Sequence, residues 1–299
     1  MEKVKENTLQ QLAAYLETHN VSINRVSKQL GYSAAVLSQY LAGKYVGDND
    51  KLEITIAAYL QRQKEIELMP KESIPFTLTT NAKQVFAIAR MCHNENEIGV
   101  ITGEAGTGKT RAIKEYSIKN PDVILIEADL SYTNKVFFRE LHKKLGMDGN
   151  GGIYDLFTDC CERLKDSGRL VVIDEAENLP YRSLDMIRRL YDKAGIGILL
   201  VGLPRLIRNL TGRKGEFKQL YSRVGFAINL ESLTDDDTKA IVTSVFPDLN
   251  GTSKVFCSLA KGNARKLEKL ILRTGRIAKT SNSEVTERTI NIAAEMLIL

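Results

Sequence analysis

The sequence predicts an α/β protein with a parallel β-sheet, preceded by one all-helical segment and followed by a smaller one. Five short apolar runs alternate with amphipathic stretches between residues 98 and 230, whereas residues 1–65 and 232–299 show only helical patterns. Strands that are apolar along their whole length and are separated by helices form parallel sheets covered on both faces. With 299 residues, 43% of them hydrophobic, the chain can bury such a core, so disordered and fibrous classes are excluded.

The five apolar runs are the expected strands, at residues 98–102, 123–126, 170–173, 196–201 and 226–230. The helices expected beside them lie at residues 81–92, 109–118 and 133–145. Before the first of these helices, Pro70 and Pro75 interrupt helix formation. The chain is therefore expected to divide into an N-terminal domain (1–65), a linker (66–80), an α/β core (81–231) and a helical C-terminal domain (232–299).

Composition limits the partners and the compartment. The chain has 42 lysines and arginines against 37 acidic residues, and its net charge of +5 allows a nucleic-acid partner without requiring one. No apolar run approaches the ~18 residues of a membrane span, and the first residues do not resemble a signal peptide. We therefore expect a cytoplasmic protein with no membrane partner. The cysteines show no metal-binding spacing and are expected to be reduced: Cys92, Cys160, Cys161 and Cys257.

A glycine-rich loop carries the strongest functional signal. Residues 103–110 (GEAGTGKT) fit the P-loop pattern G-x-x-x-x-G-K-[ST] and follow a strand and open a helix, as a P-loop must. Its glycines let successive backbone N–H groups converge on phosphate oxygens. Lys109 can reach the β- and γ-phosphates, and the Thr110 hydroxyl can ligate Mg²⁺. ATP and Mg²⁺ are thus the expected cofactors, with this nucleotide-binding set: Gly103, Glu104, Ala105, Gly106, Thr107, Gly108, Lys109, Thr110 and Arg111.

A second apolar strand ends in two carboxylates, in the sequence LVVIDE at residues 170–175. This placement brings Asp174 beside the Mg²⁺ coordination shell, as a second metal ligand with Thr110. Glu175 is then free to polarise the attacking water. The pair favours ATP hydrolysis over simple nucleotide binding, with Lys109, Asp174 and Glu175 as catalytic residues.

The N-terminal segment has the layout of a helix-turn-helix. One helix is expected from Ser22 to a break at Gly31, and a second from Ser33, which would enter the major groove of DNA. The outward residues expected to meet DNA are Ser33, Ser38, Gln39 and Lys44. None is an arginine that could pair with guanine, so poor sequence specificity is expected. The alternative is a small helical bundle used for protein contacts.

Two further regions are candidates for phosphate contacts. One is the basic stretch after the fourth strand, with Arg205, Arg208, Arg213 and Lys214. The other is the turn after the second strand, where Tyr132, Thr133 and Lys135 open a helix. Hydroxyls, lysines and helix N-termini suit phosphate oxygens and do not read bases. Double-stranded DNA is therefore an expected partner.

With its P-loop and strand-end acids, the sequence resembles an AAA+ ATPase with a helical lid domain. That resemblance implies an oligomer in which an arginine from the neighbouring subunit completes each site, and Arg223 matches this position before the fifth strand. It also implies a sensor arginine in the lid, matched by Arg265 in Gly262-Asn-Ala-Arg265. The polar sensor expected after the fourth strand has no evident match, because Val201-Gly-Leu-Pro204 occupies that place.

The order of the segments resembles the bacteriophage Mu transposition protein B family over nearly the whole chain. The motifs that carry the likeness are Leu41-Ala-Gly-Lys-Tyr-x-Gly-Asp-Asn49, Gly-x-x-Gly-x-Gly-Lys-Thr, Val-Ile-Asp-Glu-Ala176 and the stretch 217–223. At Leu203 the family commonly has asparagine. The resemblance implies a phage- or transposon-encoded protein of the bacterial cytoplasm. It also implies ATP-driven polymerisation on duplex DNA, delivery of that DNA as a transposition target and stimulation of a DDE transposase.

Two other functions share the same nucleotide residues. A replication initiator or helicase loader would act at a defined origin or on a helicase, and its recognition helix would be more basic than residues 34–38 (AAVLS). A nucleotide-gated repressor would bind an operator as a dimer and barely hydrolyse ATP. The Asp174–Glu175 pair argues against the repressor.

Overall fold

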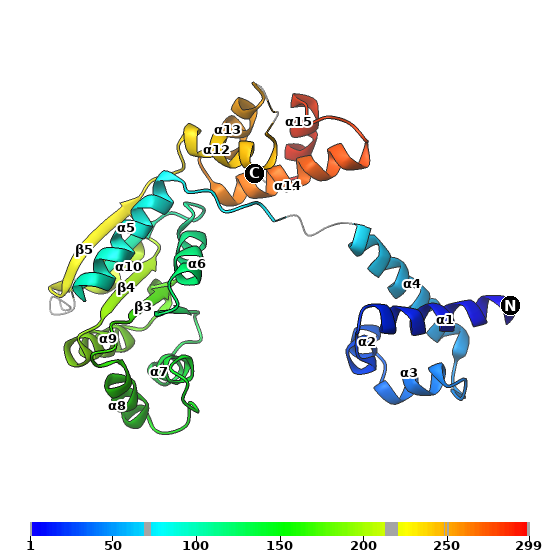
Figure 1. Ribbon diagram of the computed structural model, residues 1–299, viewed down its shortest axis with the longest axis horizontal. Helices are drawn as coiled ribbons and strands as arrows, with labels where there is room; N and C mark the ends of the chain where they lie inside the picture. Colours follow the sequence, from blue (N-terminus) through cyan, green and yellow to red (C-terminus); the bar gives the residue numbers. More distant parts are fainter. Residues whose placement is uncertain (1, 69–72, 213–220, 248, 250, 298–299) are drawn as a thin grey trace. The chain divides into compact units, whose positions relative to one another are not determined.

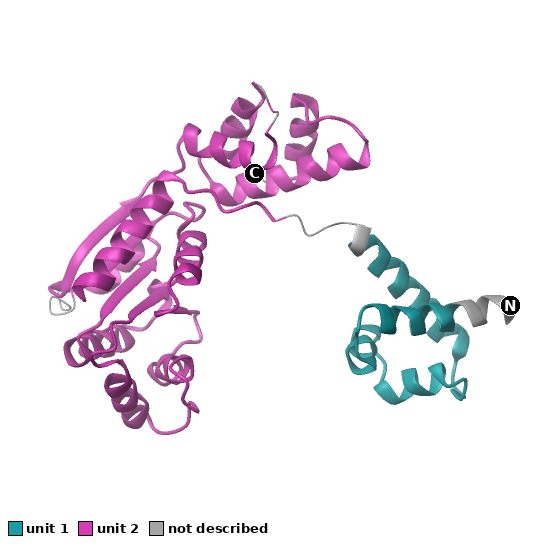
Figure 2. Ribbon diagram, in the orientation of Figure 1, with its two compact units in different colours: residues 1–72 teal, residues 73–299 magenta. Residues whose placement is uncertain are grey.

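The computed structural model describes residues 2–68, 73–212, 221–247, 249 and 251–297, which form two compact units (Figure 2). The first unit spans residues 1–72 and its described part is helical. The second unit spans residues 73–299 and contains the sheet. No helix in the described ranges is long and apolar enough to cross a membrane.

The first unit consists of α1 (Glu2–Thr18), α2 (Ile23–Leu30), α3 (Ala34–Leu41) and α4 (Asn49–Leu68). Helices α2 and α3 begin at the predicted N-caps, because the hydroxyl oxygens of Ser22 and Ser33 each accept a backbone N–H of the first turn. Gly31 ends α2 in the left-handed conformation (φ 76°), which glycine adopts without steric cost. The four helices enclose one small core, formed by Leu12, Val26, Leu37, Tyr40, Leu52, Ile56 and Leu60.

The sheet of the second unit has five parallel strands in the order β2-β3-β4-β1-β5. The strands are β1 (Ile98–Gly103), β2 (Val123–Glu127), β3 (Leu170–Asp174), β4 (Gly197–Gly202) and β5 (Val224–Leu230). All five predicted strands are confirmed, with ends displaced by at most two residues. Gly103 lies opposite Leu230, and Glu127 opposite Asp174, so the carboxyl ends of the strands share one edge.

Helices cover both faces of this sheet (Figure 1). They are α5 (Thr80–Glu95), α6 (Lys109–Lys119), α7 (Asn134–Lys144), α8 (Ile153–Leu164), α9 (Tyr181–Ala194) and α10 (Arg205–Thr211). Val171 and Ile173 pack with α7–α10, whereas Leu170 and Val172 pack with α5 and α6. Successive side chains of a strand point to opposite faces, so an apolar strand is buried on both. Helices α8, α9 and α10 have no counterpart among the predicted helices.

Four helices follow the sheet: α12 (Asp235–Val245), α13 (Ser253–Ala260), α14 (Ala264–Thr280) and α15 (Glu287–Glu295). They form their own core around Phe256, Leu270 and Ile290. A buried carboxylate joins this layer to α5, because Asp237 Oδ1 accepts from the backbone N–H of Thr80 (2.8 Å) and from its hydroxyl (3.1 Å). The C-terminal helices are therefore tied to the start of the α/β part.

The four cysteines are free thiols, as predicted. Burial raises the pKa of Cys92 and of Cys160 to about 12. Because the thiolate is the reactive form, these two side chains are inert at neutral pH and serve as small apolar core residues.

Candidate active site

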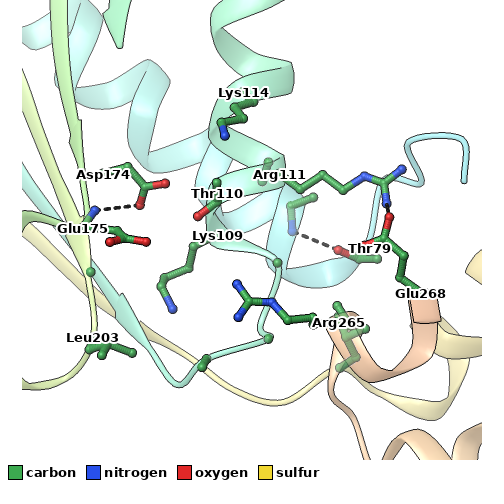
Figure 3. Close-up of a pocket in the computed structure, with 18 of the residues that line it drawn as sticks. Thr79, Lys109, Thr110, Arg111, Lys114, Asp174, Glu175, Leu203, Arg265 and Glu268 are labelled. Atoms are coloured by element: carbon green, nitrogen blue, oxygen red, sulfur yellow. Dashed lines mark hydrogen bonds and ion pairs between the residues drawn. The ribbon is translucent and has the colours of Figure 1, made fainter. Parts of the chain in front are cut away.

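A cleft of about 1150 Å³ lies at the carboxyl edge of the sheet, within the second unit (Figure 3). The P-loop and the first turn of α6 form its floor, the ends of β3 and β4 one wall, and the first turns of α14 the opposite wall. Residues 74–79, which precede α5, also line it. Open α/β sheets bind ligands in this location.

The P-loop has the conformation that its glycines permit. Gly106 and Gly108 have φ values of 91° and 90°, in the left-handed region that other residues rarely adopt. A buried amide behind the loop holds it in place: Asn81 Nδ2 donates to the carbonyl oxygens of Thr107 (3.0 Å) and Glu231 (2.8 Å). Asn81 is 6% exposed and was not among the predicted site residues. No local pattern marks it, because both of its partners are distant in sequence.

The Lys109 side chain lies inside the loop. Its Nζ donates to the carbonyl oxygens of Gly103 (2.6 Å) and Glu104 (2.9 Å) and to the Thr107 hydroxyl (3.3 Å). Burial lowers the pKa of Lys109, and the nearby Asp174 opposes that shift. The ammonium is thus desolvated and held by neutral carbonyl groups, an arrangement in which an incoming phosphate oxyanion is a stronger partner.

Thr110 and Asp174 lie together, as expected of two metal ligands. The Asp174 carboxylate is 2% exposed and accepts the backbone N–H of Glu175 (3.0 Å), and the Thr110 side chain lies near it (Figure 3). Burial raises the pKa of Asp174, although the Thr110 hydroxyl and the backbone N–H of Glu175 both favour the charged form. Mg²⁺ prefers few protein oxygens and keeps waters and phosphate ligands, which fits a single hydroxyl and a single carboxylate. No cluster of three or more His, Cys, Asp or Glu that could hold a metal is found among the described residues.

Glu175 follows directly on β3 and is exposed to the cleft. Its backbone has φ 54°, a left-handed conformation that costs a non-glycine residue about 1–3 kcal/mol. Two bonds maintain it: the N–H to Asp174, and the carbonyl oxygen, which accepts from the backbone N–H of Asn178 (2.9 Å). Such strain is typical of functional sites.

The N-terminal end of α14 contacts the P-loop directly. Asn263 caps the helix and donates from Nδ2 to the carbonyl oxygen of Ala105 (3.1 Å). The backbone N–H of Ala264 donates to the carbonyl oxygen of Gly106 (2.7 Å). Arg265, the predicted lid arginine, points into the cleft toward Lys109 (Figure 3). Its positive charge contributes to the lowered pKa of Lys109.

Arg111, one of the predicted nucleotide ligands, lies on the cleft wall. Its guanidinium hydrogen-bonds the carbonyl oxygen of Ile74 and lies 3.7 Å from the Glu268 carboxylate of α14. The side chain thereby joins the segment before α5 to the C-terminal helices.

Arg223 lies outside its own cleft. It directly precedes β5, is 46% exposed at its side chain and pairs with Asp192 at 3.0 Å. β5 runs seven residues to Leu230, opposite Gly103, so its two ends are roughly 20 Å apart at ~3.3 Å per residue. Arg223 is therefore remote from the P-loop of its own chain.

The expected DNA contacts occupy different environments. Lys135 and Arg208 are exposed, whereas Tyr132 is half-buried against the core and its pKa is raised by that burial. The Thr133 hydroxyl caps α7 by accepting from Val136 N–H (3.3 Å). Arg213 and Lys214 lie outside the described residues. In the first unit Ser38, Gln39 and Lys44 are exposed, and the Ser33 hydroxyl is used as the α3 cap.

Comparison with known proteins defines the class of this site. The AAA domain family matches residues 92–210. The fold is similar to the ADP form of the ORC2 protein of Aeropyrum pernix, with a TM-score of 0.60 and 17% identity, over 77% of this chain and 72% of that chain. The chain is an AAA+ ATPase.

Two curated proteins define the family. The chain is 30% identical to the ATP-dependent target DNA activator B of Escherichia phage Mu, over 77% of this chain and 75% of that protein. It is 27% identical to the Mu-like prophage FluMu DNA transposition protein B of Haemophilus influenzae, over 78% of this chain and 83% of that protein. The chain belongs to the phage Mu transposition protein B family, as the resemblance of its motifs implied.

Proposed function

We propose that this protein is an ATP-dependent DNA-binding ATPase that polymerises on duplex DNA with little sequence preference, delivers it as a transposition target and stimulates a DDE transposase. The observation that carries the proposal is the single cleft in which the P-loop, Asp174, Glu175 and Arg265 meet. The proposal is also supported by family membership, because the relative from phage Mu is named an ATP-dependent target DNA activator. The proposal places it in the cytoplasm of a bacterial host.

In the proposed hydrolysis step each residue has a separate task. Mg²⁺, when bound, neutralises charge on the β- and γ-phosphates, and Thr110 and Asp174 are the residues that would hold it. Lys109 exchanges its loop carbonyls for phosphate oxygens. Glu175 orients and polarises the attacking water, and Arg265 adds positive charge from the lid side.

We further propose that Arg223 acts on the nucleotide of a neighbouring copy. Its exposure and its distance from its own P-loop leave it available at the surface. An arginine supplied in this way would make hydrolysis depend on assembly.

DNA contact is assigned to exposed cations rather than to base-reading groups. Lys135 and Arg208, with Arg213 and Lys214, are proposed to bind phosphates, and Tyr132 and Thr133 shape the turn before Lys135. Helices α2 and α3 are proposed as a helix-turn-helix with Ser33, Ser38, Gln39 and Lys44 toward DNA. The proposed domains are residues 1–65, 81–231 and 232–299, with 66–80 as the linker.

The test measures, by fluorescence anisotropy, how the protein binds two DNA duplexes of unrelated sequence in the presence of ATP or of ADP. The wild-type protein should bind both duplexes alike with ATP and weakly with ADP. Lys109→Ala should lose ATP binding and ATP-dependent DNA binding together, because the phosphates lose their lysine. Glu175→Gln should bind both duplexes with ATP and hydrolyse it poorly. A Glu175→Gln protein that ignores DNA in the presence of ATP would contradict the proposed coupling.

A further inference from the structure

A hydrogen-bonded chain of side chains leads from α10 to the water-polarising glutamate. Asn178 Nδ2 donates to Glu175 Oε2 at 3.1 Å. Arg205 Nη2, from the first residue of α10, donates to Asn178 Oδ1 at 3.0 Å. All three residues line the nucleotide cleft. The contact between Arg205 and Asn178 does not follow from the motifs, because the two residues are 27 positions apart in the sequence.

The hydrogen-bond donors and acceptors of Arg205, Asn178 and Glu175 can be paired in one way only. Arginine has donors and no acceptor, so Arg205 must face the oxygen of the Asn178 amide. That choice turns the amide nitrogen toward Glu175, where a carboxylate accepts. The same nitrogen lies 3.4 Å from the carbonyl oxygen of Ala128 at the end of β2. Arg205 therefore sets the orientation in which Asn178 holds the Glu175 carboxylate.

A buried acid keeps Arg205 in this place. The Glu177 side chain is only 5% exposed, and its Oε1 lies 3.9 Å from Arg205 Nη2. Its Oε2 has no hydrogen-bond partner among the described residues, and Lys109 is a second cation that interacts with this carboxylate. The backbone of Glu177 is fixed in turn, because its carbonyl oxygen accepts from Asn209 Nδ2 (3.0 Å). The opposite charge of Glu177 attracts the half-exposed Arg205 guanidinium at this distance, with solvent screening part of the interaction.

We propose that Asn178 and Arg205 are positioning residues of the ATPase site: Asn178 holds the Glu175 carboxylate toward the cleft, and Arg205 fixes the orientation of Asn178. Leu203, which lines the same wall, has no polar side-chain atom for this task. The inference rests on the proposed role of Glu175. It also moves Arg205 from the set of DNA contacts to the nucleotide site, and leaves Arg208, one helical turn further on, exposed for DNA.

The experiment compares full-length variants in single-turnover and steady-state ATP hydrolysis with Mg²⁺ and saturating duplex DNA. Asn178→Ala and Arg205→Ala should each lower kcat about tenfold or more, because a hydrogen bond that orients a charged group is lost, with KM for ATP nearly unchanged. Arg205→Lys should recover part of the loss. Arg182→Ala, which removes an exposed positive charge from α9, is the control for loss of charge and should keep kcat.

A measurement of DNA binding in the presence of ATP distinguishes an arginine of α10 that positions catalytic groups from one that contacts DNA. Arg205→Ala should retain it, whereas Arg208→Ala should weaken it. An Arg205→Ala protein that hydrolyses normally but binds DNA weakly would overturn the inference. So would a rise in kcat for Asn178→Ala, since the contact would then restrain Glu175. If Asn178→Ala does not fold, the half-exposed Arg205→Ala decides the matter.

Glu175→Gln is measured in parallel, so that the two proposals can fail separately. Normal hydrolysis by Glu175→Gln would refute the proposed role of Glu175 itself. Poor hydrolysis by Glu175→Gln, together with normal hydrolysis by Asn178→Ala and Arg205→Ala, would refute the positioning role alone.

Discussion

Asn263, the N-cap of α14, donates a hydrogen bond from its amide to the carbonyl oxygen of Ala105 in the P-loop, 3.1 Å away. The same side chain packs against Gly106, where any β-carbon would collide with it. Its Oδ1 also accepts the backbone N–H groups of Arg265 and Lys266. One residue therefore links the shape of the P-loop to the position of the lid arginine.

Replacing this residue should affect both stability and nucleotide binding. Asn263→Ala removes a helix cap, which costs about 1 kcal/mol, and also the bond to the P-loop. Thr286→Ala is the matched control, since Thr286 caps α15 by the same means and does not line the cleft. Thermal unfolding should show similar losses for both variants, whereas titration with ATP should show weaker binding for Asn263→Ala only. Equal ATP affinity in the two variants would contradict the proposed link.

Asp174 should oppose the stability of the nucleotide-free protein. Burial raises its pKa, so the folded state binds this proton more tightly than the unfolded state does. Stability from this group is therefore greatest at low pH and falls as pH rises through the raised pKa. At pH 8, Asp174→Asn should raise the Tm of the apo protein, by roughly 2–4 °C for each 1 kcal/mol relieved, and abolish Mg²⁺-dependent hydrolysis. Calorimetry checks the first effect, with the exposed Glu175→Gln as control; a lowered Tm would refute it.

Arg223→Ala should reduce hydrolysis without reducing ATP affinity. A missing trans arginine lowers kcat on the order of 10³-fold, because charge on the γ-phosphate is no longer neutralised. Mixing Arg223→Ala with Glu175→Gln, which should still bind ATP and assemble, should restore part of the activity, since one partner supplies the arginine and the other the catalytic glutamate. Arg189→Ala, which removes another exposed and ion-paired arginine, should have no such effect. The absence of recovery in mixtures of proven hetero-oligomers would argue against action in trans.

Salt dependence should show how many phosphates the protein contacts. The logarithm of the DNA-binding constant falls linearly with the logarithm of salt concentration, with a slope near −0.9 for each neutralised phosphate. Lys135→Ala should reduce this slope by about 1 on each of two unrelated duplexes. Lys119→Ala, where the lysine is paired with Glu115 at 3.0 Å, should leave the slope unchanged. A loss confined to one duplex would indicate base reading at Lys135 instead.

The strands and the P-loop could be predicted because their signals are local. An apolar run such as residues 196–201 indicates a strand that is buried on both faces. The spacing of Gly103, Gly108 and Lys109 identifies a P-loop within eight consecutive residues. The N-caps Ser22 and Ser33 were recognisable for the same reason, since each accepts a backbone N–H three residues on. Local rules act within a few residues, and the sequence displays them directly.

The residues that hold the site together could not be predicted in this way. Asn81, Asn178 and Asn263 each bond backbone or side-chain atoms brought near by the fold, and an isolated asparagine has no periodicity. Helix α8 is not predicted, because it follows the glycine-rich turn 149–152 and its N-cap residue, Gly152, has no side chain; instead the Asp155 carboxylate accepts the backbone N–H of Gly152 (3.0 Å). The sequence predicts Arg205 as a DNA-phosphate contact, because nothing local shows that its partner Glu177, 28 residues earlier, is buried beside it.

Electron microscopy of the purified protein with random-sequence duplex DNA, in ATP and in ADP, tests the central claim most directly. The account predicts continuous filaments covering the DNA in ATP only, for the wild-type protein and for Glu175→Gln, and none for Lys109→Ala. Isolated rings or dimers at particular DNA sites, or filaments that form equally with ADP, would contradict it.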